Sequence, residues 1–245
     1  MQSRGRVRMR KLLAYGQHTI IIIGTGHVFS ASIREVEGTI AGVAPAAVCV
    51  ELDPERYQAL LSGERATFWD LFRARGLGFA LFSSIMSGIQ GQIGQDFGVM
   101  PGSDMLAAVT AAEQARSPVF FVDRNVGVTI ARLVQGMPKR EMAKMLGGAL
   151  LSLLPFKKTV SEAEFDERFV SSILKEFKAY SPTAYRVLIE ERNAHMGRAI
   201  VGVASRFAEP VTLVVVVGAG HLPGLHEWLT GHAPVERGAE QHPSS

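Results

Sequence analysis

The sequence predicts an α/β protein with a mostly parallel central sheet flanked by helices and an inserted helical cap or dimerisation element. Two observations predict this class. Four short runs rich in Val, Ile and Phe are apolar on both faces, and each is followed by a segment with helical periodicity. Strands that are buried on both faces and alternate with helices are typical of a parallel sheet covered by helices.

The elements can be assigned in order along the chain. We expect strands over 19–24, 46–51, 118–122 and 211–217. We expect helices over 29–43, 54–62, 103–115 and 222–230, and further helices between the strand over 118–122 and about residue 208. Asp53 followed by Pro54 is the residue pair that favours a helix start, with Asp53 as its cap.

The length of 245 residues and the 47% hydrophobic content predict one large core. We expect a single domain over 17–232 with helical insertions at about 64–100 and 137–180, a basic arm over 1–16 and a disordered tail over 233–245. Residues 76–95 carry no charge, but their apolar residues recur every three or four positions, which indicates a helix packed within protein. We expect this helix to pack against the 137–180 helices or against a second subunit, which favours a homodimer.

The charge is concentrated at the N-terminus. The isoelectric point is about 9.2, yet five basic residues lie in the first eleven positions without an acid, and the rest of the chain is slightly acidic. We therefore expect no nucleic-acid partner, and a solvated arm with weak membrane-surface contact as the alternative. The single Cys49 in an apolar run indicates a buried thiol in a reducing compartment, and no signal-peptide pattern precedes it. A cytoplasmic protein, membrane-associated at most, is expected.

Two similar loops follow the first and last predicted strands: GTGH at 24–27 and GAGH at 218–221. Ligands of parallel sheets bind beyond the carboxyl ends of the strands, where these loops meet those at Glu51 and at Asp123. Two imidazoles and a carboxylate there can hold a divalent transition metal with room for water. The glycines allow tight turns and exposed N–H groups that suit an anion.

Other interpretations stay open at this point. GTGHVF followed by Glu51 resembles a dinucleotide-binding loop with its ribose-binding acid, although the third glycine is missing and the repeated histidine is unexplained. A histidine at a helix start is also compatible with a capping residue. Arg56 is either a solvated charge or a ligand for a substrate carboxylate, and Asp123 with Arg124 is compatible with a local ion pair.

Six segments carry a resemblance to a known family. They are, in order, IIIGTGHVFSASIREVEGTI, PAAVCVELDPERYQAL, MPGSDMLAAVTAAEQA, VFFVDRNVGVTIARL, IEERNAHMGRAI and VVVVGAGHLPGL. The chain resembles the TraB/PrgY family, related to the TIKI and GumN proteins. The resemblance implies a metal-dependent hydrolase-like site: TIKI proteins are divalent-metal proteases acting on peptide termini, and PrgY-like members are linked to blocking a peptide pheromone.

Carried over to this chain, the resemblance implies His27, Glu51 and His221 as the metal site, with Arg56, Arg124 and Arg192 as further matches within the family's motifs. Many TraB-like proteins continue into membrane-spanning segments, whereas this chain ends in polar residues.

The sequence therefore predicts a metal-dependent peptide hydrolase with a Mn, Co or Zn ion. Glu51 is either a metal ligand or the general base for water, and Arg56 or Arg192 holds a substrate carboxylate. The alternatives are a protein that sequesters a peptide without cleaving it and a dinucleotide-binding oxidoreductase.

Overall fold

A five-stranded, mostly parallel sheet forms the centre of the protein. The computed structural model describes residues 9–26, 30–62, 102–144 and 166–234. The strands are β1 (Arg10–Tyr15), β2 (His18–Thr25), β3 (Ala47–Val50), β4 (Val119–Phe121) and β5 (Thr212–Gly218). Their order across the sheet is β1-β2-β5-β3-β4, and only β1 runs antiparallel to its neighbour. The predicted α/β class is confirmed.

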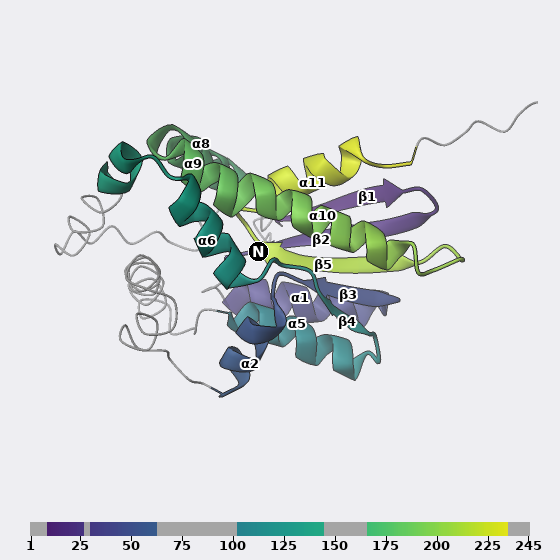
Figure 1. Ribbon diagram of the computed structural model, residues 1–245. Coiled ribbons are helices and arrows are strands. Elements are labelled where there is room, and N and C mark those ends of the chain that lie inside the picture. Colours follow the sequence, from purple (N-terminus) through teal and green to yellow (C-terminus); the bar gives the residue numbers. More distant parts are fainter. Residues whose placement is uncertain (1–8, 27–29, 63–101, 145–165, 235–245) are drawn as a thin grey trace, which may run out of the picture.

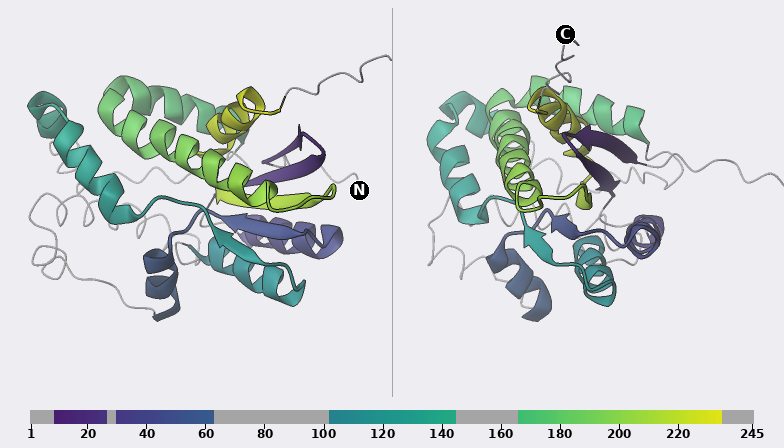
Figure 2. Two further views of the ribbon diagram at one scale, coloured as in Figure 1. Left: turned by 45° about the vertical axis from the view of Figure 1, so that its right-hand side comes forward. Right: turned by 90° about the vertical axis from the view of Figure 1, so that its right-hand side faces the viewer.

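Helices cover both faces of this sheet (Figure 1). On one face, α1 (Ser30–Val43) and α5 (Ser103–Gln114) pack against alternate residues of β2, β3 and β5. On the other face lie α10 (Glu191–Ala204) and α11 (Leu222–Gly231), as the two views of Figure 2 show. Each central strand is therefore buried on both sides, which explains its unbroken apolar sequence.

The remaining helices gather at the end of the sheet where the parallel strands stop (Figure 1). They are α2 (Pro54–Ser62), α6 (Val126–Gly136), α8 (Glu167–Tyr180), α9 (Pro182–Tyr185) and the π-helical turn η1 (Arg186–Glu190), which leads directly into α10. A π-helical turn within a helical run is uncommon and is frequent at functional sites. The predicted helices over 29–43, 54–62, 103–115 and 222–230 match the observed ones to within a residue.

The strand β1 corrects one expectation. Residues 10–15 belong to the predicted basic arm, but they form an edge strand in which Arg10 faces Ile23 and Tyr15 faces His18. The alternation of the segment explains this: Tyr15 is buried and Leu13 packs against the core, while Leu12 is exposed. The Tyr15 hydroxyl also donates to the His232 carbonyl at 2.9 Å, which ties β1 to the end of α11.

Close helix packing fixes α10 against α11. A Cβ atom at Gly197 would lie 2.0 Å from Cε3 of Trp228, so only glycine permits this approach. The predicted thiol of Cys49 is indeed buried in the core, and burial raises its pKa to about 12. These contacts make the face that carries α10 a tightly packed support for the loops at the sheet edge.

The helical insertion predicted over 64–100 lies entirely outside the described residues, as do residues 145–165 of the one over 137–180. The packing of residues 76–95 and the homodimer that it favours stay predictions. Within the described ranges, no helix combines the length and the apolar character needed to cross a membrane.

Candidate functional site

The ends of three parallel strands meet at one edge of the sheet. In the register, Thr25 of β2 lies beside Gly218 of β5, and Val50 of β3 lies beside Val216 of β5. The last strand in the chain has inserted between the first two parallel ones, so the two loops of the GxxH pattern leave neighbouring strands. The expected neighbourhood of these loops is confirmed at the strand ends; His27 itself lies outside the described residues.

Close approach of the two loops explains the first glycine of the pattern. A Cβ at Gly24 would lie 2.9 Å from Cδ2 and 3.1 Å from Cβ of Leu222, and 3.4 Å from Cα of Ala219. The Ala219 N–H donates to the Thr25 carbonyl at 2.8 Å, which continues the pairing of β2 and β5 into the second loop. Gly24 is needed because Leu222, at the start of α11, and Ala219 of the second loop pack on it, rather than for a tight turn of its own.

Glu51 follows β3 directly and turns its carboxylate towards the second loop. Its Oε2 accepts a 2.6 Å hydrogen bond from the Gly218 N–H, and its Oε1 accepts a 2.5 Å bond from Nη2 of Arg192. Its side chain is only 7% exposed. An exposed N–H after the last strand was expected to bind an anion, and in this structure the anion is the protein's own carboxylate.

Arg192, in the first turn of α10, joins the loops after β3 and β4. Its Nε and Nη2 donate to the two oxygens of Asp123 at 2.9 and 2.7 Å, so the pair is bidentate. Nη1 also donates to the carbonyl of Leu188 in η1 at 3.3 Å. Burial alone would lower the pKa of Arg192, but the charges of Glu51 and Asp123 outweigh it and raise that pKa. The guanidinium is therefore fully engaged by the protein.

His221 stands at the start of α11, but its side chain makes no capping bond. Its Nδ1 lies 2.7 Å from Oδ1 of Asn193, and its Nε2 lies 2.9 Å from Nη1 of Arg192. The same Nε2 is 3.4 Å from Oε1 of Glu51. The imidazole is buried and directed at the carboxylate, so the interpretation of His221 as a capping residue does not hold.

Asp53 and Arg56 lie at the rim of this cluster. Oδ1 of Asp53 accepts from the N–H groups of Glu55 and Arg56 at 3.0 and 3.2 Å, which confirms Asp53 as the cap of α2. Nη1 of Arg56 is 3.4 Å from Oδ2 of Asp123, and 39% of the Arg56 side chain is exposed. Arg56 is thus the more accessible of the two arginines that contact Asp123.

Arg124 belongs to a different network from its neighbour Asp123. Its backbone N–H donates to Oδ1 of Asp123, but its guanidinium donates to Glu191 at 3.0 Å, to the Thr129 hydroxyl at 3.0 Å and to the Val187 carbonyl at 2.9 Å. The interpretation of Asp123 and Arg124 as a local ion pair is therefore wrong, because residues of α6, η1 and α10 bind the guanidinium of Arg124.

The cluster consists of two carboxylates, one imidazole and one enclosed guanidinium. Two donor atoms bound to one zinc ion at about 2.0–2.2 Å in tetrahedral geometry lie roughly 3.3 Å apart, and Glu51 Oε1 and His221 Nε2 are 3.4 Å apart. This pair can share a metal ion. In the described part of the chain, no group of three His, Cys, Asp or Glu side chains is placed to hold a metal.

Asn193 and Asp123 are the residues whose importance sequence reasoning underestimated. Asn193 lies within the segment IEERNAHMGRAI that carried the resemblance, one position after Arg192, but no spacing rule assigns it a partner. Asp123 stood at a strand end, and that position was the signal for it.

Comparison with known proteins identifies several relatives of this chain. The chain is 32% identical to an uncharacterized protein of Methanocaldococcus jannaschii over 220 residues, covering 86% of this chain and 53% of that protein. It is 25% identical to a TraB domain-containing protein of Bos taurus and 24% identical to one of Homo sapiens, covering 90% of this chain and 65% of each. The chain thus spans between half and two thirds of the length of these relatives.

The match to a family model covers nearly the whole described fold. The model of the TraB/PrgY/gumN family matches residues 11–230, from β1 through α11. This range includes both loops of the GxxH pattern, Glu51 and Arg192. The chain therefore belongs to the TraB/PrgY/gumN family.

Proposed function

We propose that this protein is a metal-dependent peptide hydrolase whose divalent ion is held by His27, Glu51 and His221. One observation supports this above all: Oε1 of Glu51 and Nε2 of His221 are 3.4 Å apart at the carboxyl edge of the sheet, which is the spacing of two ligands of one ion. In the sequence, His27 comes two positions after the end of β2, and β2 ends at this same edge.

The charge of the cluster also favours a bound cation. Glu51 and Asp123 are both nearly buried and share one enclosed guanidinium, that of Arg192, with Arg56 at longer range. Two buried carboxylates facing one buried cation leave a negative site. When bound, a Mn, Co or Zn ion supplies Lewis acidity that polarises a carbonyl and acidifies water.

The protein's own residues divide the remaining work. Glu51 serves either as a ligand or as the general base, and in both roles the Gly218 N–H holds its Oε2 so that Oε1 faces His221. Arg192 keeps that carboxylate in place. Arg56, the more exposed arginine, is the one able to turn from Asp123 to a substrate carboxylate, because its 3.4 Å contact is long.

A second function is favoured by one specific observation. Arg192 already donates to both Oε1 of Glu51 and Nε2 of His221, the two atoms that an ion would bind. A guanidinium that satisfies these atoms by itself gives a stable site without a metal, and such a site would capture a peptide without cleaving it. The dinucleotide alternative is less favoured, because the Glu51 carboxylate is nearly buried and both its oxygens accept bonds from the protein.

The deciding experiment compares wild type with Glu51→Gln after chelator treatment and titration with Mn²⁺, Co²⁺ or Zn²⁺. A peptide library is incubated with each protein, and new termini are sought by mass spectrometry. We expect cleavage by the wild type and a loss of at least ~10²-fold in Glu51→Gln, the scale for removing a general base. Peptide binding should persist.

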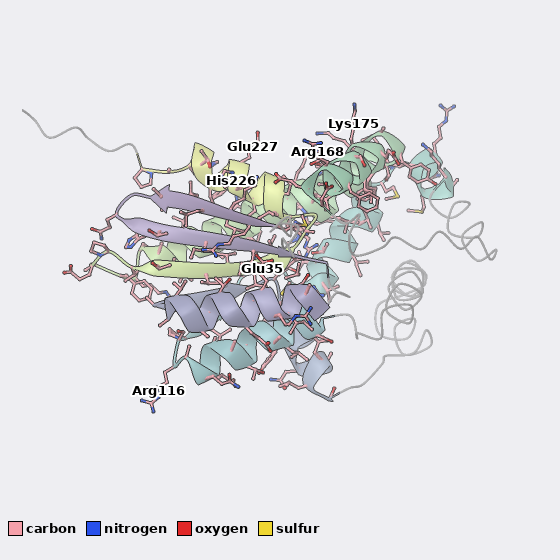
Figure 3. The ribbon with its side chains drawn as sticks, turned by 180° about the vertical axis from the view of Figure 1, so that it is seen from behind. Glu35, Arg116, Arg168, Lys175, His226 and Glu227 are labelled. Carbon is pink, nitrogen blue, oxygen red and sulfur yellow. The ribbon has the colours of Figure 1, made fainter. Side chains whose placement is uncertain are left out.

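The matched control is Glu227→Gln, since Glu227 projects from the outer side of α11 (Figure 3) and is exposed. Thermal unfolding of each variant establishes that it is folded. Unchanged cleavage in Glu51→Gln contradicts the assigned role of Glu51, and retained but intact peptides with every metal favour sequestration. Saturable micromolar NAD(P) or FAD binding would favour the third alternative.

A further inference from the structure

The side chain of Asn193 contacts the ring of His221 at the nitrogen that faces away from Glu51. Both residues are 4% exposed, and Oδ1 of Asn193 lies 2.7 Å from Nδ1 of the imidazole. The opposite ring nitrogen, Nε2, faces Arg192 at 2.9 Å and Glu51 at 3.4 Å. The imidazole thus has Asn193 on one side and both Arg192 and Glu51 on the other, and the identity of these neighbours determines where its proton lies.

The guanidinium of Arg192 favours one of the two neutral tautomers of His221, and the group that faces Nδ1 must complete that preference. Arginine has only N–H donors and no acceptor, so Nη1 of Arg192 requires a lone pair on Nε2 of His221. A neutral imidazole with a lone pair on Nε2 carries its proton on Nδ1. That N–H must then find an acceptor, and the amide oxygen of Asn193 is the group at the right distance. The amide is therefore oriented with its oxygen towards the ring.

The backbone of α11 keeps the other end of the amide in place. A Cβ at Gly224 would lie only 2.4 Å from Nδ2 of Asn193, so the amide packs directly against the first turn of α11. His221 and Gly224 are in the same turn, and the side chain of Asn193 reaches both of them from α10. Glycine at 224 is thus a condition for the Asn193 side chain to reach His221.

We propose that Asn193 is a positioning residue that fixes His221 as the Nδ1–H tautomer, with the Nε2 lone pair directed at Nη1 of Arg192 on the side of the ring that faces Glu51. Its catalytic consequence rests on the proposed metal-dependent function, because an Nε2 lone pair is what a metal ion requires. A neutral amide acceptor holds the ring without adding a further negative charge to a cluster that already has two carboxylates. Residues that hold a ligating histidine in this way contribute roughly 10–100-fold to metal affinity.

The tautomer can be measured in the metal-free protein by ¹⁵N NMR of histidine side chains. The signals of His221 are assigned by their loss in His221→Asn. We expect wild-type His221 to be wholly the Nδ1–H tautomer at neutral pH, and Asn193→Leu to give a mixture in which Nε2–H appears. An Nε2–H tautomer in the wild type, or an unchanged tautomer in folded Asn193→Leu, overturns the proposal.

A second pair of variants tests the same point without altering the amide. Gly224→Ala should displace Asn193 and shift His221 towards the same mixture. The matched control is Gly202→Ala in α10, where an added Cβ meets nothing within 4 Å and the tautomer should stay as in wild type. An unchanged spectrum in folded Gly224→Ala contradicts the supporting role of the close contact at Gly224.

Calorimetric titration with Zn²⁺ then connects the tautomer to the metal. We expect Asn193→Leu to bind Zn²⁺ about 10–100-fold more weakly than wild type, while the surface variant His226→Asn binds as wild type does. If the wild type binds no metal but shows the Nδ1–H tautomer, the positioning role stands and the metal-dependent function fails. If the wild type binds metal and Asn193→Leu binds it equally well, the positioning role fails alone.

Discussion

Two consecutive residues of α10, Glu191 and Arg192, belong to ionic networks of opposite composition. Arg192 is the one enclosed cation between the carboxylates of Glu51 and Asp123, whose side chains are 7% and 3% exposed. Glu191 is one anion among three cations, those of Arg124, Arg132 and Arg186.

The two networks also differ in their contact with water. Among the cations around Glu191, the side chain of Arg124 is 11% exposed, but those of Arg132 and Arg186 are 54% and 49% exposed. The side chain of Arg192, which contacts Glu51 and Asp123 at 2.5 and 2.7 Å, is 14% exposed. Coulomb energies are several times larger in a partly desolvated site than in water, and so is the cost of leaving one charge alone. The buried network, which consists of Arg192, Glu51 and Asp123, therefore sets the geometry at the sheet edge. The outer network, which consists of Glu191 and its three arginines, only clamps α6 and η1 to α10.

The largest expected effect comes from removing the cation of the buried network. Arg192→Met leaves Glu51 and Asp123 as two nearly buried carboxylates without their shared partner, and we expect the free energy of unfolding to fall by about 3–5 kcal/mol. Urea denaturation followed by circular dichroism measures the change. The control Arg132→Met removes a solvated arginine and should leave the unfolding free energy almost unchanged. Equal losses in both variants would abolish the distinction between the networks.

Asp123→Asn should have an intermediate effect. The carboxylate of Asp123 accepts two bonds from Arg192, one from Arg56 and one from the N–H of Arg124. An amide keeps one acceptor oxygen but places an N–H₂ donor against a guanidinium, so we expect a loss of about 1–3 kcal/mol in the same denaturation experiment. Glu227→Gln serves as the neutralised surface control. A loss as large as that of Arg192→Met would mean that Asp123, rather than Glu51, accounts for most of the stabilisation of Arg192.

Much of this fold could be predicted because its signals are local. Buried parallel strands give unbroken apolar runs, and Asp53 with Pro54 gives a helix start that the structure reproduces. The edge strand β1 was missed because its basic residues are concentrated with those of the arm, and an edge strand needs only one apolar face. Its partner, the strand of Ile20–Ile23, supplies the pairing that RKLLAY alone does not reveal.

The site was predictable in position but not in its pairings. Parallel strands place the loops at Glu51 and His221 at one edge, which the sequence indicates through strand ends alone. Which arginine meets which carboxylate depends on the rotation of α10 and on the π-helical turn η1 before it, and neither has a sequence signature. Arg124 and Arg192 therefore exchange the partners that chain proximity favoured: Asp123 binds Arg192 bidentately, and Arg124 binds Glu191.

The smallest expected effect concerns the outer network and its dependence on pH. Hydrogen bonding to Arg132, with Arg124 adding to it, lowers the pKa of Glu191 below its ordinary value even though partial burial opposes this. A carboxyl whose pKa is lower in the folded state stabilises the protein above the unfolded-state pKa, and this contribution is lost as pH falls through the folded-state pKa. Wild type should therefore be slightly more stable than Glu191→Gln near pH 7, and the difference in melting temperature should shrink below about pH 4.5. Added salt should reduce the difference at pH 7, because water reaches two of the three arginines. A difference that instead persists at low pH and high salt would show that Glu191 acts through packing rather than charge, and the contrast with Arg192 would then be one of burial alone.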